Sequence, residues 1–205
     1  DLSGPALDRA RAAIEKSLGK FVEKGKLSVS DRDAALGRIT TATSLDALAS
    51  ADYVVEAIVE QADAKRALFK TLDTLTRPDV ILASNTSSIS ITQLAAVVQN
   101  PQRFIGMHFF NPVPVMALLE LIRGLQTSDD THAKAEAFAK KVGKVAITAK
   151  NSPGFAVNRI LCPMINEAIF ALQDGLASAQ AIDDGMKLGC NHPIGPLALA
   201  DMIGL

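Results

Sequence analysis

Residues 104–122 read FIGMHFFNPVPVMALLELI, and this stretch decides the fold. Two apolar segments flank a connection rich in proline and valine, a pattern that predicts two strands joined as a hairpin. A symmetric hairpin centred on Pro114 places His108 opposite Glu120, where the two side chains are close enough to meet. Burying the carboxylate of Glu120 among leucines would be costly without a partner, and histidine is a suitable one. The hairpin therefore predicts a buried His–Glu pair, either catalytic or structural.

Outward from the hairpin, short apolar strands alternate with helices. Strands are predicted at 53–58, 80–83, 104–107, 118–122 and 145–148, and helices at 5–24, 31–38, 62–76, 90–98 and 129–142. Ser30 is the expected cap of the helix over 31–38. Short, continuously apolar strands separated by helices are typical of a mostly parallel sheet that is covered on both faces. The predicted fold class is therefore α/β.

The pattern changes at Asn151-Ser152-Pro153-Gly154, and beyond it only helices are predicted. These helices lie at 155–173, at 178–188 and from 196 onward. Ser178 is expected to cap the second of them and Gly189 to end it. We therefore expect a sheet domain over 1–150 and an all-α domain over 151–205. Because the chain starts in the run-up to one helix and stops inside another, we also expect a piece of a longer chain.

The composition is that of an ordinary globular protein, with 48% apolar and 21% charged residues among 205. A formal net charge of −1 does not indicate a nucleic-acid or membrane-surface partner. No apolar run is long enough to span a membrane, and no signal peptide is visible. Cys162 and Cys190 lack metal-ligand spacing, as do the 3 histidines, so we expect no metal site and a reducing, cytoplasmic compartment.

Polar loops follow three successive strands. The first strand leads to Glu60, the second to Ser84-Asn85-Thr86-Ser87-Ser88, and the third to His108 and Asn111. Turn chemistry explains any one of these loops, because serine, asparagine and proline all favour turns. Open α/β sheets, however, bind ligands at the carboxyl ends of their strands. Three polar loops at one such edge therefore favour a binding or catalytic site.

The predicted site suits general base catalysis. The imidazole of His108 would take a proton, while the carboxylate of Glu120 orients the ring and stabilises the imidazolium. Ser87 leaves a second interpretation open, an acyl hydrolase with a Ser/His/Glu triad, although the Gly-x-Ser-x-Gly elbow is missing at this serine. A third interpretation is a non-catalytic relative that keeps the scaffold. His132 stands at a helix start beside two aspartates and is expected to be solvated.

Six motifs with a common order and spacing extend through the whole chain. They are VVEAIVE at 54–60, SNTSSISIT at 84–92, GMHFFNPVPVM at 106–116, SPGFAVNRIL at 152–161, AIDDGMKLG at 181–189 and PIGPLALADMIGL at 193–205. With these motifs the chain resembles the L-3-hydroxyacyl-CoA dehydrogenase family, which includes the 3-hydroxybutyryl-CoA dehydrogenases. The agreement of several long motifs makes the resemblance specific.

The resemblance implies an architecture and an activity. The fold would be an incomplete Rossmann-type, NAD-binding domain over 1–150, followed by an incomplete helical substrate and dimerisation domain over 151–205. The activity would be NAD-dependent interconversion of (S)-3-hydroxyacyl-CoA and 3-ketoacyl-CoA by hydride transfer. Such a reaction belongs to fatty-acid beta-oxidation or short-chain acyl-CoA metabolism. The implied partners are an acyl-CoA substrate and a second copy of the chain, in a homodimer.

The resemblance also implies roles for the residues of the predicted site. His108 would be the general base that removes the proton of the 3-hydroxyl group, with Glu120 as its orienting partner. Ser87 and Asn158 would donate hydrogen bonds around the reacting oxygen of the substrate. Asn111 would lie at the nicotinamide end of the cofactor. Without the resemblance, Asn158 would be read as an exposed polar residue of an amphipathic helix.

Four further residues take cofactor or coenzyme A roles by resemblance. Glu60 and Lys65 would lie along the ribose of NAD, with Ser87 close to the cofactor as well. Ser17 and Lys24, on the first helix, match positions that contact coenzyme A, whose phosphates suit an ammonium group. Read from the residues alone, the basic stripe on this helix is a solvated face.

The chain departs from the family pattern at both ends. The family begins with a strand, a G-x-G-x-x-G turn, a helix and a second strand ending in an acidic residue, and it continues with helices of the dimer interface. This chain contains no G-x-G, and in the family that glycine turn holds the pyrophosphate. We therefore expect the chain to bind NAD poorly or not at all, and to be inactive, when it is tested alone.

Overall fold

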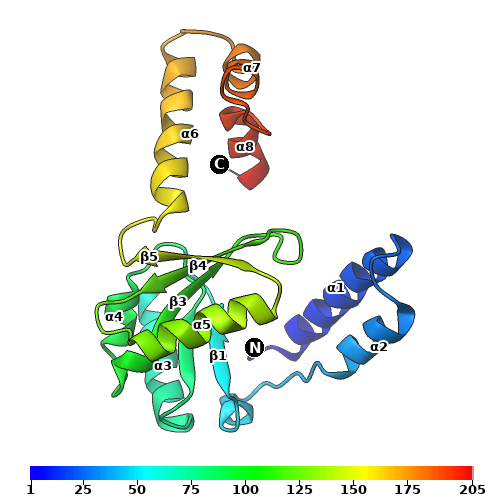
Figure 1. Cartoon of the computed structure of the whole chain (residues 1–205), viewed down its shortest axis with the longest axis vertical. Coiled ribbons are helices and arrows are strands. Elements are labelled where there is room, and N and C mark those ends of the chain that lie inside the picture. Colours follow the sequence, from blue (N-terminus) through cyan, green and yellow to red (C-terminus); the bar gives the residue numbers. More distant parts are fainter. Residues whose placement is uncertain (205) are drawn as a thin grey trace. The chain divides into compact units, whose positions relative to one another are not determined.

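The computed structural model describes residues 1–204, and Figure 1 shows the order of their helices and strands. The elements are α1 (Gly4–Glu23), α2 (Val29–Gly37), η1 (Leu45–Leu48), β1 (Tyr53–Glu56), α3 (Ala62–Leu75), β2 (Ile81–Ser84), α4 (Ile91–Ala95), η2 (Pro101–Arg103), β3 (Phe104–Phe109), β4 (Leu118–Arg123), α5 (Asp129–Lys141), β5 (Val145–Lys150), α6 (Val157–Gln173), α7 (Ala179–Cys190) and α8 (Pro196–Ile203). They fall into two compact units, Asp1–Asp52 with Thr71–Val80, and Tyr53–Lys70 with the chain from Ile81 onward. The sheet and the last three helices belong to the second unit.

In the first unit, α1 and α2 pack against each other. Helix α1 begins after Ser3, whose hydroxyl accepts a hydrogen bond from a backbone N–H of the first turn. The predicted cap of α2 is wrong, because Ser28 rather than Ser30 accepts the N–H of Asp31. Ser28 has the extended backbone that a cap needs, with ψ of 156°, whereas Ser30 already lies inside the first turn.

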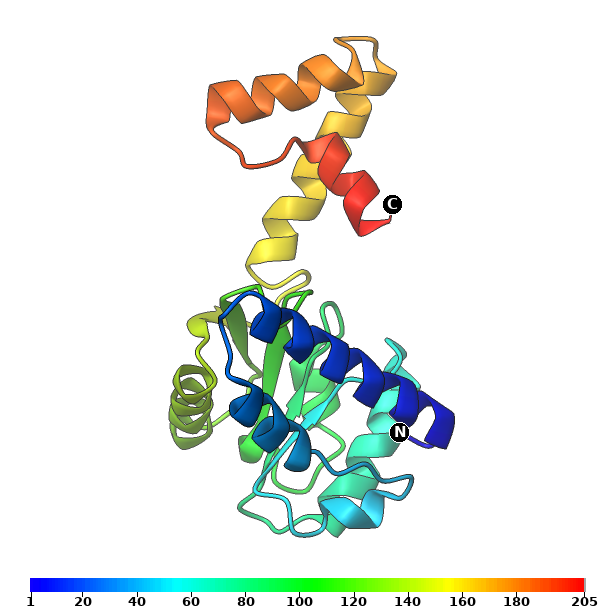
Figure 2. The same cartoon turned by 90° about the vertical axis from the view of Figure 1, so that its right-hand side faces the viewer.

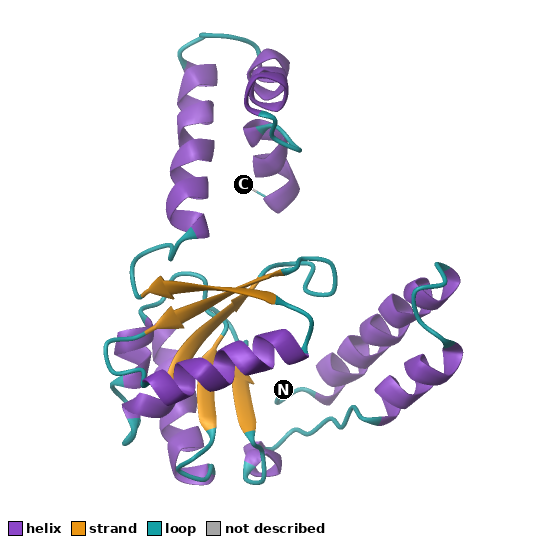
Figure 3. Cartoon of the chain, viewed as in Figure 1, coloured by secondary structure: helices purple, strands orange, loops and turns teal. Residues whose placement is uncertain are grey.

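The sheet has five strands in the order β1-β2-β3-β4-β5. The pairs β1/β2, β2/β3 and β4/β5 are parallel and the pair β3/β4 is antiparallel, which confirms the mostly parallel α/β sheet. In the antiparallel pair His108 lies opposite Glu120, in the register predicted from the hairpin. Figure 3 shows the strands side by side with their loops at both ends. Because β1, β2 and β3 run in the same direction, their carboxyl ends meet at one edge.

Apolar side chains fill the space on both faces of the sheet. On the face that α5 covers (Figure 3), the buried cluster consists of Ile81, Ala83, Ile105, Met107, Leu119, Leu121, Ala135 and Ala139. On the other face, Phe69 of α3 meets Phe104 with ring centroids 4.6 Å apart. A Cβ atom at Gly106 would come within 2.8 Å of Ile91 in α4, so the close packing of this helix needs glycine there. Burial on both faces explains why β2, β3 and β4 are continuously apolar.

The last three helices contact one another, and Figure 2 shows α7 lying across one end of α6 with α8 beside it. Ser178 caps α7 as predicted, because its hydroxyl accepts the N–H of Ala181. The predicted end at Gly189 is wrong, since α7 continues to Cys190 and Asn191 takes the left-handed conformation that ends it, with φ of 55°. Among residues 1–204, no helix combines the length and the apolar character that a membrane span requires.

Candidate active site

The predicted His–Glu pair is present and buried. The Nδ1 atom of His108 lies 2.7 Å from the Oε2 atom of Glu120, and the two residues are 7% and 0% exposed. The register of β3 and β4 brings them together, because directly opposite residues of an antiparallel pair have neighbouring side chains. The contact between His108 and Glu120 that was predicted from the hairpin is therefore confirmed.

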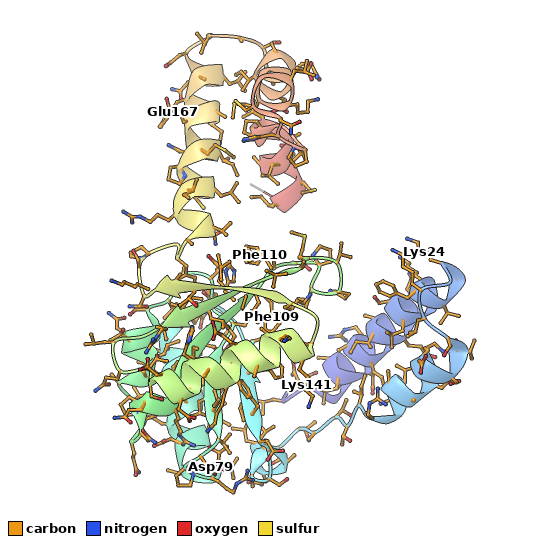
Figure 4. All side chains as sticks on the ribbon, viewed as in Figure 1. Lys24, Asp79, Phe109, Phe110, Lys141 and Glu167 are labelled. Carbon is orange, nitrogen blue, oxygen red and sulfur yellow. The ribbon has the colours of Figure 1, made fainter. Side chains whose placement is uncertain are left out.

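Two aromatic rings hold the imidazole of His108. The ring of Phe110, labelled in Figure 4, lies 4.5 Å away between centroids, and the ring of Phe155 lies 5.8 Å away with an edge-on orientation. Phe155 is buried and has a positive φ of 50°, which is uncommon for a bulky residue and is found where the surroundings impose it. These contacts limit the rotation of the imidazole and exclude water from one side of it.

The second carboxylate oxygen of Glu120 reaches a different segment of the chain. Its Oε1 atom accepts hydrogen bonds from the backbone N–H groups of Ala156, at 3.1 Å, and Val157, at 3.0 Å. These groups are unpaired donors at the start of α6, where a negative charge is favourable. Since Asn158 is the next residue, Glu120 joins the imidazole of His108 to the helix that carries Asn158.

The turn that leads into α6 depends on glycine. Gly154 has φ of 74°, and a Cβ atom there would lie only 2.7 Å from the backbone nitrogen of Arg159. A residue with a side chain would therefore be strained in conformation and would also push against the first turn of the helix. The position of Asn158 follows from this tight turn.

One cleft brings Ser87 and Asn158 together. It has a volume of about 640 Å³ and is lined by Ser87, Ser88, Pro153, Gly154, Asn158, Arg159, Cys162 and Pro163. Ser87 and Asn158 were predicted as site residues from different segments of the sequence, and the fold places both on the wall of the cleft. Arg159 and Cys162 also line the cleft and were not predicted. They lie one and four residues after Asn158 on α6, and this spacing is the signal that could have indicated them.

Glu60 joins the loops that follow β1 and β2. Its Oε1 atom accepts hydrogen bonds from the Ser87 N–H and the Ser88 hydroxyl, both at 3.1 Å, and from the Thr86 hydroxyl. Burial acts to raise the pKa of the Glu60 carboxyl, but the hydrogen bonds from Thr86 and Lys65 and the charge of Lys65 outweigh it and leave the pKa below its ordinary value of 4.5. The predicted meeting of polar strand ends is confirmed for these two loops.

A second buried carboxylate escaped the sequence analysis. Glu56, at the end of β1, is 3% exposed and lies 2.5 Å from the ammonium group of Lys65, which is 1% exposed. Ser84, opposite Glu56 on β2, donates its hydroxyl hydrogen to Glu56 at 2.6 Å. The signal was available, because Glu56 stands in an apolar strand just as Glu120 does.

The segment that carries Asn111 follows β3 and is exposed. At its start, the Phe109 N–H donates to the side-chain oxygen of Asn85 at 2.8 Å, a contact that the sequence analysis did not predict. Farther along, the ammonium group of Lys144 donates to the carbonyl groups of Val113 and, at 2.7 Å, Met116. Asn111 therefore lies in a connection that is tied to the protein on both sides.

The remaining sequence-predicted residues lie elsewhere. Ser17 is half-buried on α1, and Lys24 is exposed just after the end of this helix (Figure 4). Both belong to the first unit, so their predicted contacts with coenzyme A stay predictions.

His132 is not simply solvated, because its Nε2 atom lies 2.8 Å from the hydroxyl of Thr148. Within residues 1–204, no three histidine, cysteine, aspartate or glutamate side chains gather in a way that could hold a metal ion.

Two family models together match nearly the whole chain. The model described as 3-hydroxyacyl-CoA dehydrogenase, NAD binding domain, matches residues 1–152, and that described as 3-hydroxyacyl-CoA dehydrogenase, C-terminal domain, matches 154–205. With the fold and the site, these matches define the class of the protein as an NAD-dependent oxidoreductase. The chain belongs to the 3-hydroxyacyl-CoA dehydrogenase family. This membership sets aside the acyl hydrolase alternative.

Relatives with high sequence identity support the family. The chain is 50% identical over 205 residues to the probable 3-hydroxybutyryl-CoA dehydrogenase of Bacillus subtilis, covering 100% of the chain and 71% of that protein. It is 55% identical over 199 residues to the probable 3-hydroxybutyryl-CoA dehydrogenase of Deinococcus radiodurans, covering 97% and 71%. The crystal structure of (S)-3-hydroxybutyryl-CoA dehydrogenase from Ralstonia eutropha superposes with a TM-score of 0.97 at 60% identity, covering 99% of this chain and 72% of that one.

Proposed function

We propose that the protein oxidises (S)-3-hydroxyacyl-CoA to 3-ketoacyl-CoA, and catalyses the reverse reaction, with His108 and Glu120 as a general base pair. The observation that carries this proposal is the 2.7 Å contact between the buried imidazole and carboxylate, at the carboxyl end of β3. Two relatives are named probable 3-hydroxybutyryl-CoA dehydrogenase, and these names support the substrate class. When NAD is bound, it supplies the acceptor for the hydride that leaves C3.

The geometry of the pair sets the tautomer of His108. An ionised carboxylate only accepts hydrogen bonds, so Glu120 keeps the proton of the imidazole on Nδ1. The lone pair on Nε2 is then available for the proton of the 3-hydroxyl group. As that proton arrives, the imidazole becomes positively charged, and Glu120 stabilises the charge. In the reverse direction the same imidazolium returns the proton to the developing alkoxide.

Ser87 and Asn158 are proposed to hold the reacting oxygen. Both line the cleft of about 640 Å³, one from the loop after β2 and one from the first turn of α6. A hydroxyl and a carboxamide are suitable donors to a carbonyl oxygen that gains negative charge during reduction. Their contribution is to orient the substrate so that C3 and the base are correctly placed.

The residues of this chain fit one end of the cofactor. Carboxylate, hydroxyl and amide groups at the ends of β1, β2 and β3 suit the hydroxyl groups of a ribose and a nicotinamide carboxamide. We propose Glu60, Ser87 and Asn111 for these contacts, with Lys65, which is paired with Glu60, beside the ribose. The pyrophosphate requires a glycine-rich turn at a helix start. No two of the 13 glycines of the chain are separated by a single residue, so the residues present do not form that turn.

The remaining expectations about the whole protein also stay proposals. We propose a domain division near residue 151, coenzyme A contacts from Ser17 and Lys24, and a homodimer formed through the helical domain. We also propose a cytoplasmic role in fatty-acid beta-oxidation or short-chain acyl-CoA metabolism. The motifs shared with the family support these proposals.

The base assignment is tested by replacing His108 with Gln in the full-length protein. We expect kcat for the reduction of acetoacetyl-CoA by NADH to fall by about 10²- to 10⁴-fold, the usual contribution of a general base. The dissociation constant of NADH, measured by fluorescence, should stay close to that of the unsubstituted protein. His132→Gln, in α5, is the matched control and should leave both quantities unchanged. Loss of NADH affinity with unchanged chemistry would contradict the assignment.

A further inference from the structure

The connection between β3 and β4 carries Asn111 and is exposed along its whole length. Residues 111–117 are all exposed, and Met116, the least exposed of their large apolar side chains, is still 40% exposed. Two of these residues are prolines, which have no backbone N–H to donate. Apolar burial therefore does not fix the shape of this connection, and hydrogen bonds to its carbonyl groups are the contacts that can.

One ammonium group holds the middle of the connection. Lys144 donates to the carbonyl oxygens of Val113 and, at 2.7 Å, Met116. Within the connection, the N–H groups of Val115 and Met116 donate to the carbonyl group of Pro112 at 2.9 and 3.0 Å, so these residues form one closed turn. Hydrogen bonds from a charged donor are about twice as strong as neutral ones. The ammonium group therefore fastens this turn at two points.

The backbone around Lys144 is itself fixed by the fold. Its N–H donates to the carbonyl group of Ala139, in the last turn of α5, at 2.9 Å, and Ala139 is fully buried. The next N–H, that of Val145, donates to the carbonyl group of Ala117 at 2.8 Å. Gly143, with φ of 72°, makes the corner between α5 and β5. Lys144 thus extends from a rigid corner to an exposed turn.

At its other end the connection is continuous with the proposed base. The Phe109 N–H, at the end of β3, donates to a side-chain oxygen in the loop that follows β2 at 2.8 Å. The ring of Phe110 lies 4.5 Å from the imidazole of His108 between centroids. Asn111 is the next residue, so it lies between a segment that is fixed to the site and a turn that is fixed by Lys144.

We propose that Lys144 is a positioning residue for the nicotinamide end of the cofactor. By holding the turn that follows Asn111, its ammonium group limits the directions in which the Asn111 carboxamide can point. A binding group that is already in place loses less conformational entropy when its ligand arrives. The inference rests on the proposed contact of Asn111 with the nicotinamide, and it deepens that proposal by naming the residue that maintains the contact.

The test variant is Lys144→Met, which keeps most of the side-chain length and removes the ammonium group. The carbonyl groups that lose their donor belong to an exposed connection, so water can replace it and we expect the fold to be retained. Lys141→Met is the matched control, because Lys141 is the exposed last residue of α5 (Figure 4).

Affinities for NADH and for ADP-ribose are measured in the full-length protein by calorimetry. ADP-ribose keeps the pyrophosphate and both riboses of NADH but lacks the nicotinamide. In Lys144→Met we expect the dissociation constant of NADH to rise by about 3- to 10-fold, the effect of one misplaced hydrogen-bonding group, and that of ADP-ribose to stay the same. The control should change neither. An equal rise for both ligands, or no change for either, would overturn the proposal.

A double-mutant cycle with Asn111→Ala tests the route of the effect. If Lys144 acts through Asn111, the loss of NADH affinity caused by Lys144→Met should nearly vanish in the Asn111→Ala background, whereas independent effects would add. An additive cycle would therefore overturn this inference alone.

Two further outcomes separate this inference from the proposals on which it rests. If Asn111→Ala leaves NADH affinity unchanged, the proposed contact of Asn111 fails, and this inference fails with it. Reduction of acetoacetyl-CoA by the unsubstituted protein is measured separately, and its absence would contradict the proposed function rather than the role of Lys144.

Discussion

Glu120 shows how one side chain serves two neighbours. Its Oε2 atom faces the imidazole of His108, and its Oε1 atom accepts two backbone N–H groups at the start of α6. An ionised carboxylate accepts hydrogen bonds at both oxygens, whereas a carboxamide of the same size has only one accepting oxygen. Glutamate can therefore accept from the imidazole and from the helix start at the same time. The orientation of the base and the placement of α6 therefore depend on the same residue.

Replacing Glu120 with Gln should disturb both neighbours. An amide has one accepting oxygen, so its NH₂ group must face a donor at His108 or at the helix. We expect a loss of about 1–3 kcal/mol in the free energy of unfolding, measured in urea. We also expect kcat to fall by up to about 10²- to 10⁴-fold as the tautomer control is lost. Glu167→Gln, on α6 (Figure 4), is the control. An unchanged kcat would refute the orienting role.

The lowered pKa of the Glu60 carboxyl predicts a pH dependence of stability. Because its pKa in the folded protein is below the ordinary value of 4.5, the carboxylate stabilises the fold above that pH, and the contribution is lost as the pH falls through the folded-state pKa. The difference in unfolding free energy between the unsubstituted protein and Glu60→Gln should therefore shrink below about pH 4.5. Urea unfolding between neutral and acidic pH measures it, and a difference that does not vary with pH would contradict the prediction.

Two buried carboxylates stand in apolar strands, and only one of them was predicted from the sequence. Glu120 was selected because it stands among leucines and has a histidine opposite it in a local hairpin. Glu56 also stands in an apolar strand, but its partner Lys65 lies across a loop and on a helix. No local spacing indicates that contact, so its recognition required the fold.

At the scale of elements, strand and helix limits depend on neighbours that lie far away in the chain. The strand expected at 104–107 extends to Phe109 in β3, because β4 pairs with it on one side through that residue. The helix expected at 90–98 is shorter, with regular α-helix only from Ile91 to Ala95. Such limits reflect hydrogen bonding to partners, which the apolar pattern alone does not contain.

Gly154→Ala should destabilise the entry into α6. The residue has φ of 74°, and the added Cβ would lie 2.7 Å from the backbone nitrogen of Arg159. We expect a loss of about 1–3 kcal/mol in the free energy of unfolding, and a lower kcat because the contact of Glu120 with this helix is disturbed. Gly175→Ala is the matched control, since it has φ of 68° with open space around it. Equal losses in the two variants would show that only backbone conformation matters at Gly154.

At the scale of the whole molecule, the α/β class and the mostly parallel sheet were predicted from the alternation of apolar strands and helices. Parallel strands buried on both faces must be apolar along their whole length, and that pattern is legible in the sequence. The two compact units follow a different division, in which Thr71–Val80 joins Asp1–Asp52. Contacts between distant segments define such units, so the order of motifs did not indicate them.

The sequence by itself determined the pairing of His108 with Glu120, because the register of a hairpin is set by its short connection and by the alternation of its side chains. It also determined that the loops after successive strands meet at one edge of the sheet. Only the tertiary structure decided that Glu120 also holds α6 and that Lys65 reaches Ser87 through Glu60. These contacts join segments that no local spacing relates, and they exist because packing the sheet against its helices brings buried charges within reach of one another.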